Sequence, residues 1–178
     1  MSKRELAAAL REGHPIDPRA LDDTQYRGVS LGLPPFMIRL TWLKFRKTFH
    51  RDPSTGALRG WNVRLQQNGL DAPNVARIGP DGRAMTFGHY EVVPSDSYRP
   101  PNGAQGLVID YGRGRNGMLD PLNRVRDPLV ALEAHGAQAL LGWSYADLGV
   151  RFGTGSYFLL ELEGPLEEVV PAVELGTG

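Results

Sequence analysis

One stretch, residues 43–65, constrains the fold most, because its side chains alternate in character along two segments joined by turn residues. In the first segment Leu43, Phe45 and Phe49 fall on one side of an extended chain, and basic side chains fall on the other. Lys47 shares the apolar side and is the exception to the pattern. A period of two is typical of a β-strand with one face against a core.

The rest of this stretch supplies a turn and a return strand. Residues 52–56, DPSTG, join a proline with a preset φ to a glycine that is free to adopt positive φ. After the turn, Trp61, Val63 and Leu65 alternate with Asn62 and a basic residue. The sequence therefore predicts a β-hairpin, with Trp61 and Val63 facing a core or cavity.

Turn residues divide the remainder of the chain in the same way. The 22 glycines and 14 prolines recur at intervals of roughly 8–12 residues, which is the spacing typical of all-β sandwiches and barrels. We expect an all-β, mainly antiparallel fold, in which about 8–10 strands form one closed or nearly closed β-barrel. At 178 residues the chain fits a single domain, with a barrel over 43–163, a helix and connector over 1–42 and a loose tail over 164–178.

A short helix is predicted at the N-terminus, over residues 2–12. Ser2 is a good N-cap, Leu6 and Leu10 are one helical turn apart, and Gly13 suits the end. The helix is expected to pack against the body or to plug an opening.

Two connections have distinctive compositions. The prolines and apolar residues of 31–42 favour a helical turn or two ending near Trp42. Residues 67–82 are rich in Asn, Gly and Pro, which is typical either of a mobile lid or of a long connection.

The composition argues against several classes of function. Twenty basic residues balance twenty acidic ones, so no overall charge favours nucleic acid or a membrane surface. No cysteine is present, and no apolar run reaches the roughly 20 residues that span a bilayer. We expect a soluble, cytoplasmic protein; nothing in the sequence indicates its oligomeric state.

Aromatic residues are the first candidates for a binding site. A barrel of about eight strands is just wide enough to hold one small ligand, so inward rings would either pack a core or line a cavity. The candidate wall residues, all in predicted strands, are Trp61, Tyr90, Tyr111, Trp143 and Tyr157. Arg64 or Arg151 would meet an acidic head group.

The histidines offer a catalytic alternative. None of the four has the spacing of a metal site, and GRGRNG at 112–117 lacks the ending of a phosphate loop, so we expect no metal and no cofactor. His89 shares a predicted strand face with Glu91. His89 with Glu91 or Asp110 could serve as acid and base in an isomerase, cyclase or hydrolase. The other interpretation is an ordinary hydrogen-bonded pair.

The basic face of the hairpin offers a third alternative, a surface for an acidic partner, although the same residues would suit a solvated face paired with acids. These residues are Lys44, Arg46, Lys47, His50, Arg51, Arg59 and Arg64.

The order of these features resembles the lipocalin-like, or calycin, barrels. The resemblance rests on the early helix, on Gly60-Trp61 where those proteins have a GxW motif, and on the apolar strand SYFLLELE; it covers residues 43–163. The stretches GLVIDYG, RDPLV and LLGWSY also resemble an uncharacterised bacterial family with the same kind of barrel. The resemblance implies a barrel that binds a hydrophobic or amphipathic small molecule, such as a fatty-acid-like compound or an isoprenoid.

Overall fold

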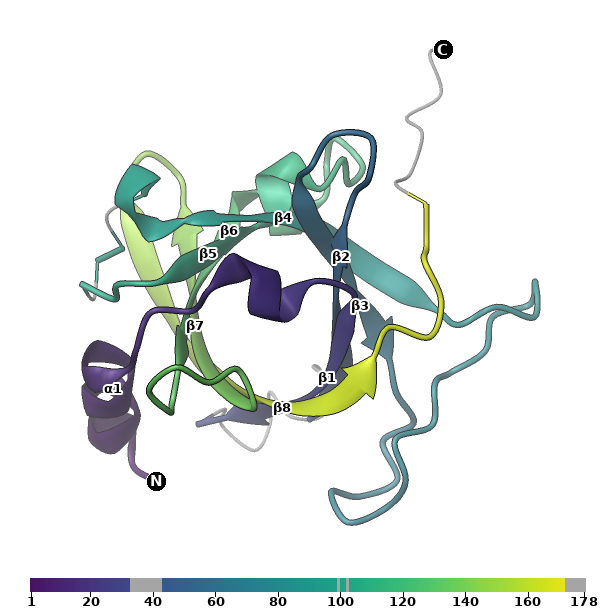
Figure 1. Cartoon of the computed structure of the whole chain (residues 1–178), viewed down its shortest axis with the longest axis horizontal. Helices are drawn as coiled ribbons and strands as arrows, with labels where there is room; N and C mark the ends of the chain where they lie inside the picture. The colour runs from purple at the N-terminus through teal and green to yellow at the C-terminus, as the bar shows by residue number, and fades with distance from the viewer. Residues whose placement is uncertain (33–42, 99, 102, 172–178) are drawn as a thin grey trace.

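The chain forms a closed antiparallel β-barrel of eight strands with a short N-terminal helix, as the sequence predicts (Figure 1). The computed structural model describes residues 1–32, 43–98, 100–101 and 103–171. Each strand pairs with the next along the chain, and β1 pairs with β8 to close the barrel. The strands are β1 (Thr24–Leu31), β2 (Lys44–Arg51), β3 (Leu58–Arg64), β4 (Thr86–Pro94), β5 (Leu107–Asp110), β6 (Val125–Ala131), β7 (Ala139–Asp147) and β8 (Arg151–Pro165).

The predicted hairpin is present as β2 and β3. Gly56 adopts a φ of 72° in the connecting turn, and the Asp52 carboxylate accepts hydrogen bonds from the backbone of Ser54 and Thr55. In the ladder Lys47 lies opposite Asn62. Because directly opposed residues share a face, this register places the two side chains on the same side of the barrel wall.

The first strand begins within the segment expected to be a connector. The inward positions of β1 are Tyr26, Gly28 and Ser30, so the strand carries little apolar alternation. Gly28 lies under the Phe45 ring, whose nearest atom would be 2.4 Å from a Cβ at position 28. The Phe45 ring thus requires a glycine at position 28. Because glycine has no apolar side chain, the alternating pattern that would identify this strand is absent from the sequence.

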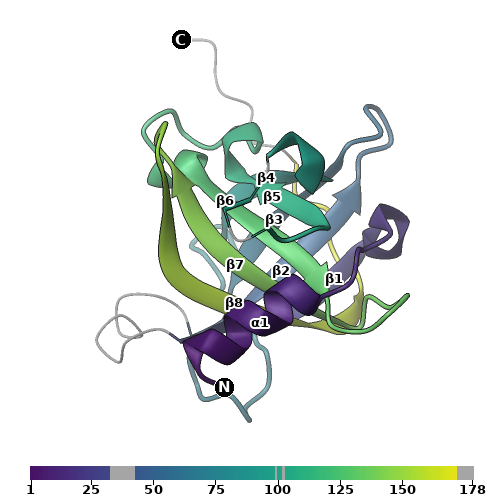
Figure 2. The same ribbon diagram turned by 90° about the vertical axis from the view of Figure 1, so that its left-hand side faces the viewer.

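The predicted helix is α1 (Lys3–Glu12), and it packs on the outside of the barrel (Figure 2). Ser2 caps it, since its side chain accepts from the Glu5 N–H while the Glu5 carboxylate accepts from the Ser2 N–H. Leu6 and Leu10 are buried in an outer cluster with Ala104, Val130, Leu141 and Tyr157.

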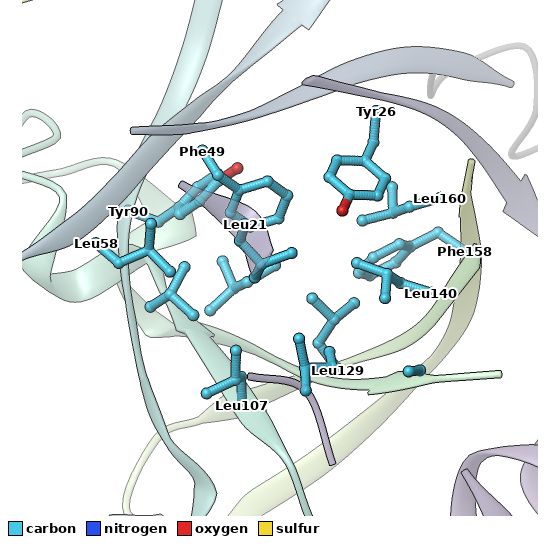
Figure 3. Close-up of a cluster of buried hydrophobic side chains, with 14 of the residues drawn as sticks. Leu21, Tyr26, Phe49, Leu58, Tyr90, Leu107, Leu129, Leu140, Phe158 and Leu160 are labelled. Atoms are coloured by element: carbon cyan, nitrogen blue, oxygen red, sulfur yellow. The ribbon is translucent and has the colours of Figure 1, made fainter. Parts of the chain in front are cut away.

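A different element closes one end of the barrel. The 3₁₀-helix η1 (Pro18–Leu21) lies across the opening that faces the viewer in Figure 1. Its Leu21 is fully buried and points into the barrel among the core side chains, including Phe49, Leu129 and Leu160 (Figure 3). Three further 3₁₀-helices are η2 (Ser95–Ser97), η3 (Tyr111–Arg113) and η4 (Pro121–Arg124).

The long connection between β3 and β4 is held in place by β-bridges and by hydrogen bonds from Lys44. Two short β-bridges, Leu65 with Ala76 and Ile78 with Ala84, organise it. Lys44 Nζ also donates to backbone carbonyls of this segment at 3.0 and 3.1 Å. These contacts agree with the interpretation of a long connection.

The tail is held as far as it is described: Leu166 N–H donates to Asp23 O, and Arg59 donates to Val170 O. The helical turn expected over 31–42 lies almost wholly outside the described residues. Among the described helices none is long and apolar enough to cross a membrane.

Candidate functional site

A pocket of about 330 Å³ opens at the end of the barrel opposite η1. It lies between the end of β1, the start of β2 and the start of β8, whereas η1 leads directly into the start of β1. Its lining is mainly apolar and comprises Ser30, Phe45, Lys47, Asn62, Phe87, Tyr111, Leu122, Val125, Asp127, Ser144, Thr154, Ser156 and Phe158. Tyr111 and Phe158 also belong to the barrel core, so these two side chains mark where the pocket meets the packed interior.

Three polar side chains meet at this boundary. Lys47 Nζ donates to the Tyr111 hydroxyl at 2.8 Å, and that hydroxyl donates to Asp127 Oδ2 at 3.0 Å. The Lys47 ammonium and Asp127 Oδ2 are 3.9 Å apart, and both side chains are at most 3% exposed. Lys47 Nζ also lies 4.6 Å from the centre of the Tyr90 ring and 5.3 Å from that of Phe158. The barrel therefore buries an ion pair, bridged by a phenol, inside an aromatic shell.

Burial shifts the protonation equilibria of these groups. Loss of hydration lowers the pKa of Lys47 to about 8, and the Asp127 charge opposes that shift. Burial raises the pKa of Asp127, against the effect of Lys47. Burial also raises the pKa of Tyr111 well above its ordinary value, so the phenol stays protonated and acts as a donor.

One oxygen of this cluster has no hydrogen bond. Asp127 Oδ1 is buried, and no described donor reaches it with hydrogen-bond geometry. The Ser144 hydroxyl, which also lines the pocket, lies close enough to lower the pKa of Asp127. An unpaired buried carboxylate oxygen costs free energy, so it is a group that a ligand or a water could satisfy.

The strands place these side chains inward by simple alternation. Lys47 lies between Phe45 and Phe49, both of which face the barrel interior. In β6, Asp127 and Leu129 are likewise two residues apart and both point inward. Lys47 stood out in the sequence as the charged residue on an apolar face, and that irregularity was the signal for the site. No comparable signal marked Asp127.

Two of the five predicted wall aromatics face the barrel interior. Tyr90 packs in the core, where its hydroxyl donates to Thr48 O at 2.6 Å, and Tyr111 reaches the pocket itself. Trp61 lies on the outer face of β3, because the neighbouring Asn62 points inward. It is nonetheless buried, beneath the β3–β4 connection and the C-terminal segment. Trp61 and Val63 are thus buried, as expected, but they face an outer layer of the molecule and not the barrel interior.

Trp143 and Tyr157 also lie outside the barrel wall. They pack in the outer cluster beneath α1, on the side opposite the inward-facing Phe158. Of the arginines expected at a head group, Arg64 lies over the Phe87 ring at 5.6 Å, and Arg151 is paired with Asp147 at 3.6 Å. Neither arginine is among the residues that line the pocket.

A bulge in β4 brings Phe87 to the pocket. Gly60 pairs with Tyr90 and Asn62 pairs with Phe87, so three steps on β4 match two on β3. The bulged segment of β4 contains Gly88, which has a φ of 53°. Phe87 therefore points inward and His89 outward, although the two residues are only two apart in the sequence.

The candidate acid–base residues lie on the outer side of the barrel wall, and none of them lines the pocket. His89 is buried on the outer side of the wall beside Trp61, and its pKa is lowered by burial and by the Arg59 charge. It lines a polar surface hollow of about 190 Å³ together with Glu91 and Arg113. Glu91 pairs with Arg113 at 3.6 Å and Asp110 pairs with Arg126 at 3.0 Å, and within the described residues neither carboxylate forms an ion pair with His89.

The basic residues of the hairpin are mostly paired, and they do not share one face. Arg46 pairs with Glu163 at 2.6 Å, Arg51 with Asp22 at 2.8 Å, and Arg59 with Asp52 at 3.5 Å. His50 pairs with Asp23 at 2.5 Å. Lys47 faces the interior. This arrangement matches the solvated, acid-paired interpretation of the basic residues.

A scan of family models, a search of curated proteins and a search of solved structures each found no match. Within the described part of the chain, no group of three or more histidine, aspartate or glutamate side chains is arranged to hold a metal ion.

Proposed function

We propose that this protein binds a small, mainly apolar molecule in the open end of its barrel. The observation that carries the proposal is the pocket of about 330 Å³, lined by Phe45, Phe87, Leu122, Val125 and Phe158, next to a buried polar centre. This volume lies at the lower end of the roughly 300–1,000 Å³ typical of ligand pockets, so a compact ligand fits best. The resemblance to lipocalin-like barrels supports the same class of function.

The charge state of the polar centre favours a neutral polar group on the ligand. Lys47 is already neutralised by Asp127 at 3.9 Å, so a carboxylate beside them would add an uncompensated buried charge. A carbonyl or hydroxyl group carries no such penalty, and it would sit beside donors and the unpaired Asp127 Oδ1. We therefore favour an amphipathic ligand with an uncharged head over a fatty acid.

Filling the pocket tests this proposal. In Ser156→Trp, an indole on β8 would occupy space among the lining residues, so affinity for the neutral probe N-phenyl-1-naphthylamine should fall at least about tenfold. Probe fluorescence titrated against purified protein gives the dissociation constant.

The matched control is Phe152→Trp, on the same strand, where the side chain is 57% exposed and does not line the pocket. It should bind the probe as the unsubstituted protein does. Absence of saturable probe binding to the unsubstituted protein, or equal affinity in Ser156→Trp, would contradict the proposal.

A further inference from the structure

The burial of the Lys47 amine is not explained by the hydrogen bonds that it makes. Its side chain is 1% exposed, yet within the described chain its Nζ makes one hydrogen bond, to the Tyr111 hydroxyl. The ammonium form has three N–H donors, so two are left to the aromatic rings and the pocket. Lysine is seldom buried without being paired and fully hydrogen-bonded.

The second buried lysine of this strand shows the structural alternative. Lys44 is equally buried, but its Nζ donates to the carbonyls of Ala72 and Pro73 and anchors the connection between β3 and β4. It does not line the pocket. Lys44 thus has an evident structural role, whereas Lys47 is one of the residues that line the pocket.

We propose that Lys47 acts as a nucleophile that condenses with the carbonyl carbon of an apolar aldehyde or ketone bound in the pocket, forming an imine. This inference rests on the proposed function, because the carbonyl compound must first enter the barrel. It deepens that function by naming the chemical class of the ligand.

The step balances without any further reactant. The neutral amine attacks the carbonyl carbon and forms the C–N bond; the two amine protons leave with the carbonyl oxygen as one molecule of water, which gives a C=N bond. Protonation of the imine nitrogen restores a single positive charge. The charge beside Asp127 is therefore the same before and after condensation, and the 3.9 Å ion pair can persist.

The neighbouring groups suit this chemistry. The Tyr111 hydroxyl, 2.8 Å from Nζ and 3.0 Å from Asp127 Oδ2, links the amine to the carboxylate and can relay protons between them. Because burial lowers the pKa of Lys47 to about 8, more of this amine is free near pH 8 than of an ordinary lysine. The apolar lining would protect an imine from water.

Reductive trapping tests the inference on the intact protein. We would incubate it at pH 8 with 3-phenylpropanal and cyanoborohydride, and locate the resulting secondary amine by peptide mass spectrometry. The sequence has only three lysines, Lys3, Lys44 and Lys47, so Lys3 and Lys44 are internal controls. We expect Lys47 to be labelled at least tenfold faster than these two lysines.

The matched alcohol, 3-phenylpropan-1-ol, separates the inference from the proposed function. If aldehyde and alcohol both displace N-phenyl-1-naphthylamine but Lys47 is not labelled faster than the control amines, imine formation is overturned and pocket binding stands. If neither displaces the probe and Lys47 is not labelled, both proposals fail.

Discussion

At the scale of single residues, the buried pair of Lys47 and Asp127 is costly to fold around. Removing two charges from water costs several kcal/mol for each ion, and their mutual attraction roughly repays that cost only with good geometry and further hydrogen bonds. Here the two charges are 3.9 Å apart, and one carboxylate oxygen has no partner. The pair is therefore better explained by a function in the pocket than by stability.

Removing only one member of this ion pair should lower the free energy of unfolding. We expect Lys47→Met to lower the free energy of unfolding by about 3 kcal/mol, because it leaves Asp127 buried without its counter-charge. The double variant Lys47→Met/Asp127→Leu should return to within about 1 kcal/mol of the unsubstituted protein. Urea unfolding followed by circular dichroism measures both values. A double variant less stable than Lys47→Met would contradict this account.

The position of a single side chain could be predicted where its neighbours in the sequence determine it, and not where strand pairing determines it. Lys47 stood out because its strand neighbours at two-residue spacing are apolar. Asp127 precedes a proline in a polar stretch, and only the pairing of β6 with β5 and β7 turns it inward. His89 and Glu91 share a strand face as predicted, but that face is the outer one, and each has other neighbours.

At the scale of elements, the Gly88 bulge decides what β4 contributes to the pocket. A Cβ at this position would lie 3.0 Å from Asn62 Nδ2 and 3.1 Å from Tyr111 Cε1. Asn62 Nδ2 also donates to the Gly88 carbonyl at 3.1 Å. The bulge thus positions two of the polar residues that line the site.

Gly88→Ala should therefore impair both stability and binding. Positive φ and the close contacts together should lower the free energy of unfolding by about 2 kcal/mol. Affinity for N-phenyl-1-naphthylamine should also fall, since Asn62 and Tyr111 must shift. Gly56→Ala is the control, because Gly56 has a similar φ of 72° but open space around it. It should lose about 1 kcal/mol and bind normally; identical effects of the two substitutions would contradict a role for the bulge.

The existence of the elements was easier to predict than their faces. The capped helix, the hairpin turn and the apolar runs of β5 and β8 all appear in the sequence as local signals. The sequence predicts that Trp61 and Val63 face the barrel interior, because they are the larger apolar side chains of β3. The structure buries them in a second layer outside the barrel, under a segment without strand periodicity of its own.

At the scale of the whole molecule, the barrel is divided along its axis. The half next to η1 is packed with side chains such as Leu21, Phe49 and Leu160, and the other half holds the pocket. A closed or nearly closed barrel of about 8–10 strands could be predicted from the number of apolar segments, and the structure has eight strands and is closed. The division into a packed half and a pocket could not be predicted, because it depends on which small side chains, such as those of Ser30 and Ser156, line one end of the barrel.

This division predicts that stability and binding can be altered separately. Leu21→Ala should create a cavity beneath η1 and lower the free energy of unfolding by about 2–4 kcal/mol, which corresponds to a fall of roughly 5–15 °C in Tm. Affinity for N-phenyl-1-naphthylamine at 20 °C should stay within about twofold. Leu148→Ala, at an exposed position, should change Tm little. A loss of probe affinity in Leu21→Ala that matches its loss of stability would show that the two halves are coupled.

Closure of one end by η1 also determines how a guest would be held. Because η1 closes one end of the barrel, a ligand would enter and leave the pocket through the other end. The part of the ligand that enters first would reach the Lys47 amine, and the opposite part would stay near solvent. A guest longer than the pocket would therefore protrude at the rim, where its far end remains open to contact by other molecules. A barrel built in this way can carry a compound and display it at the same time.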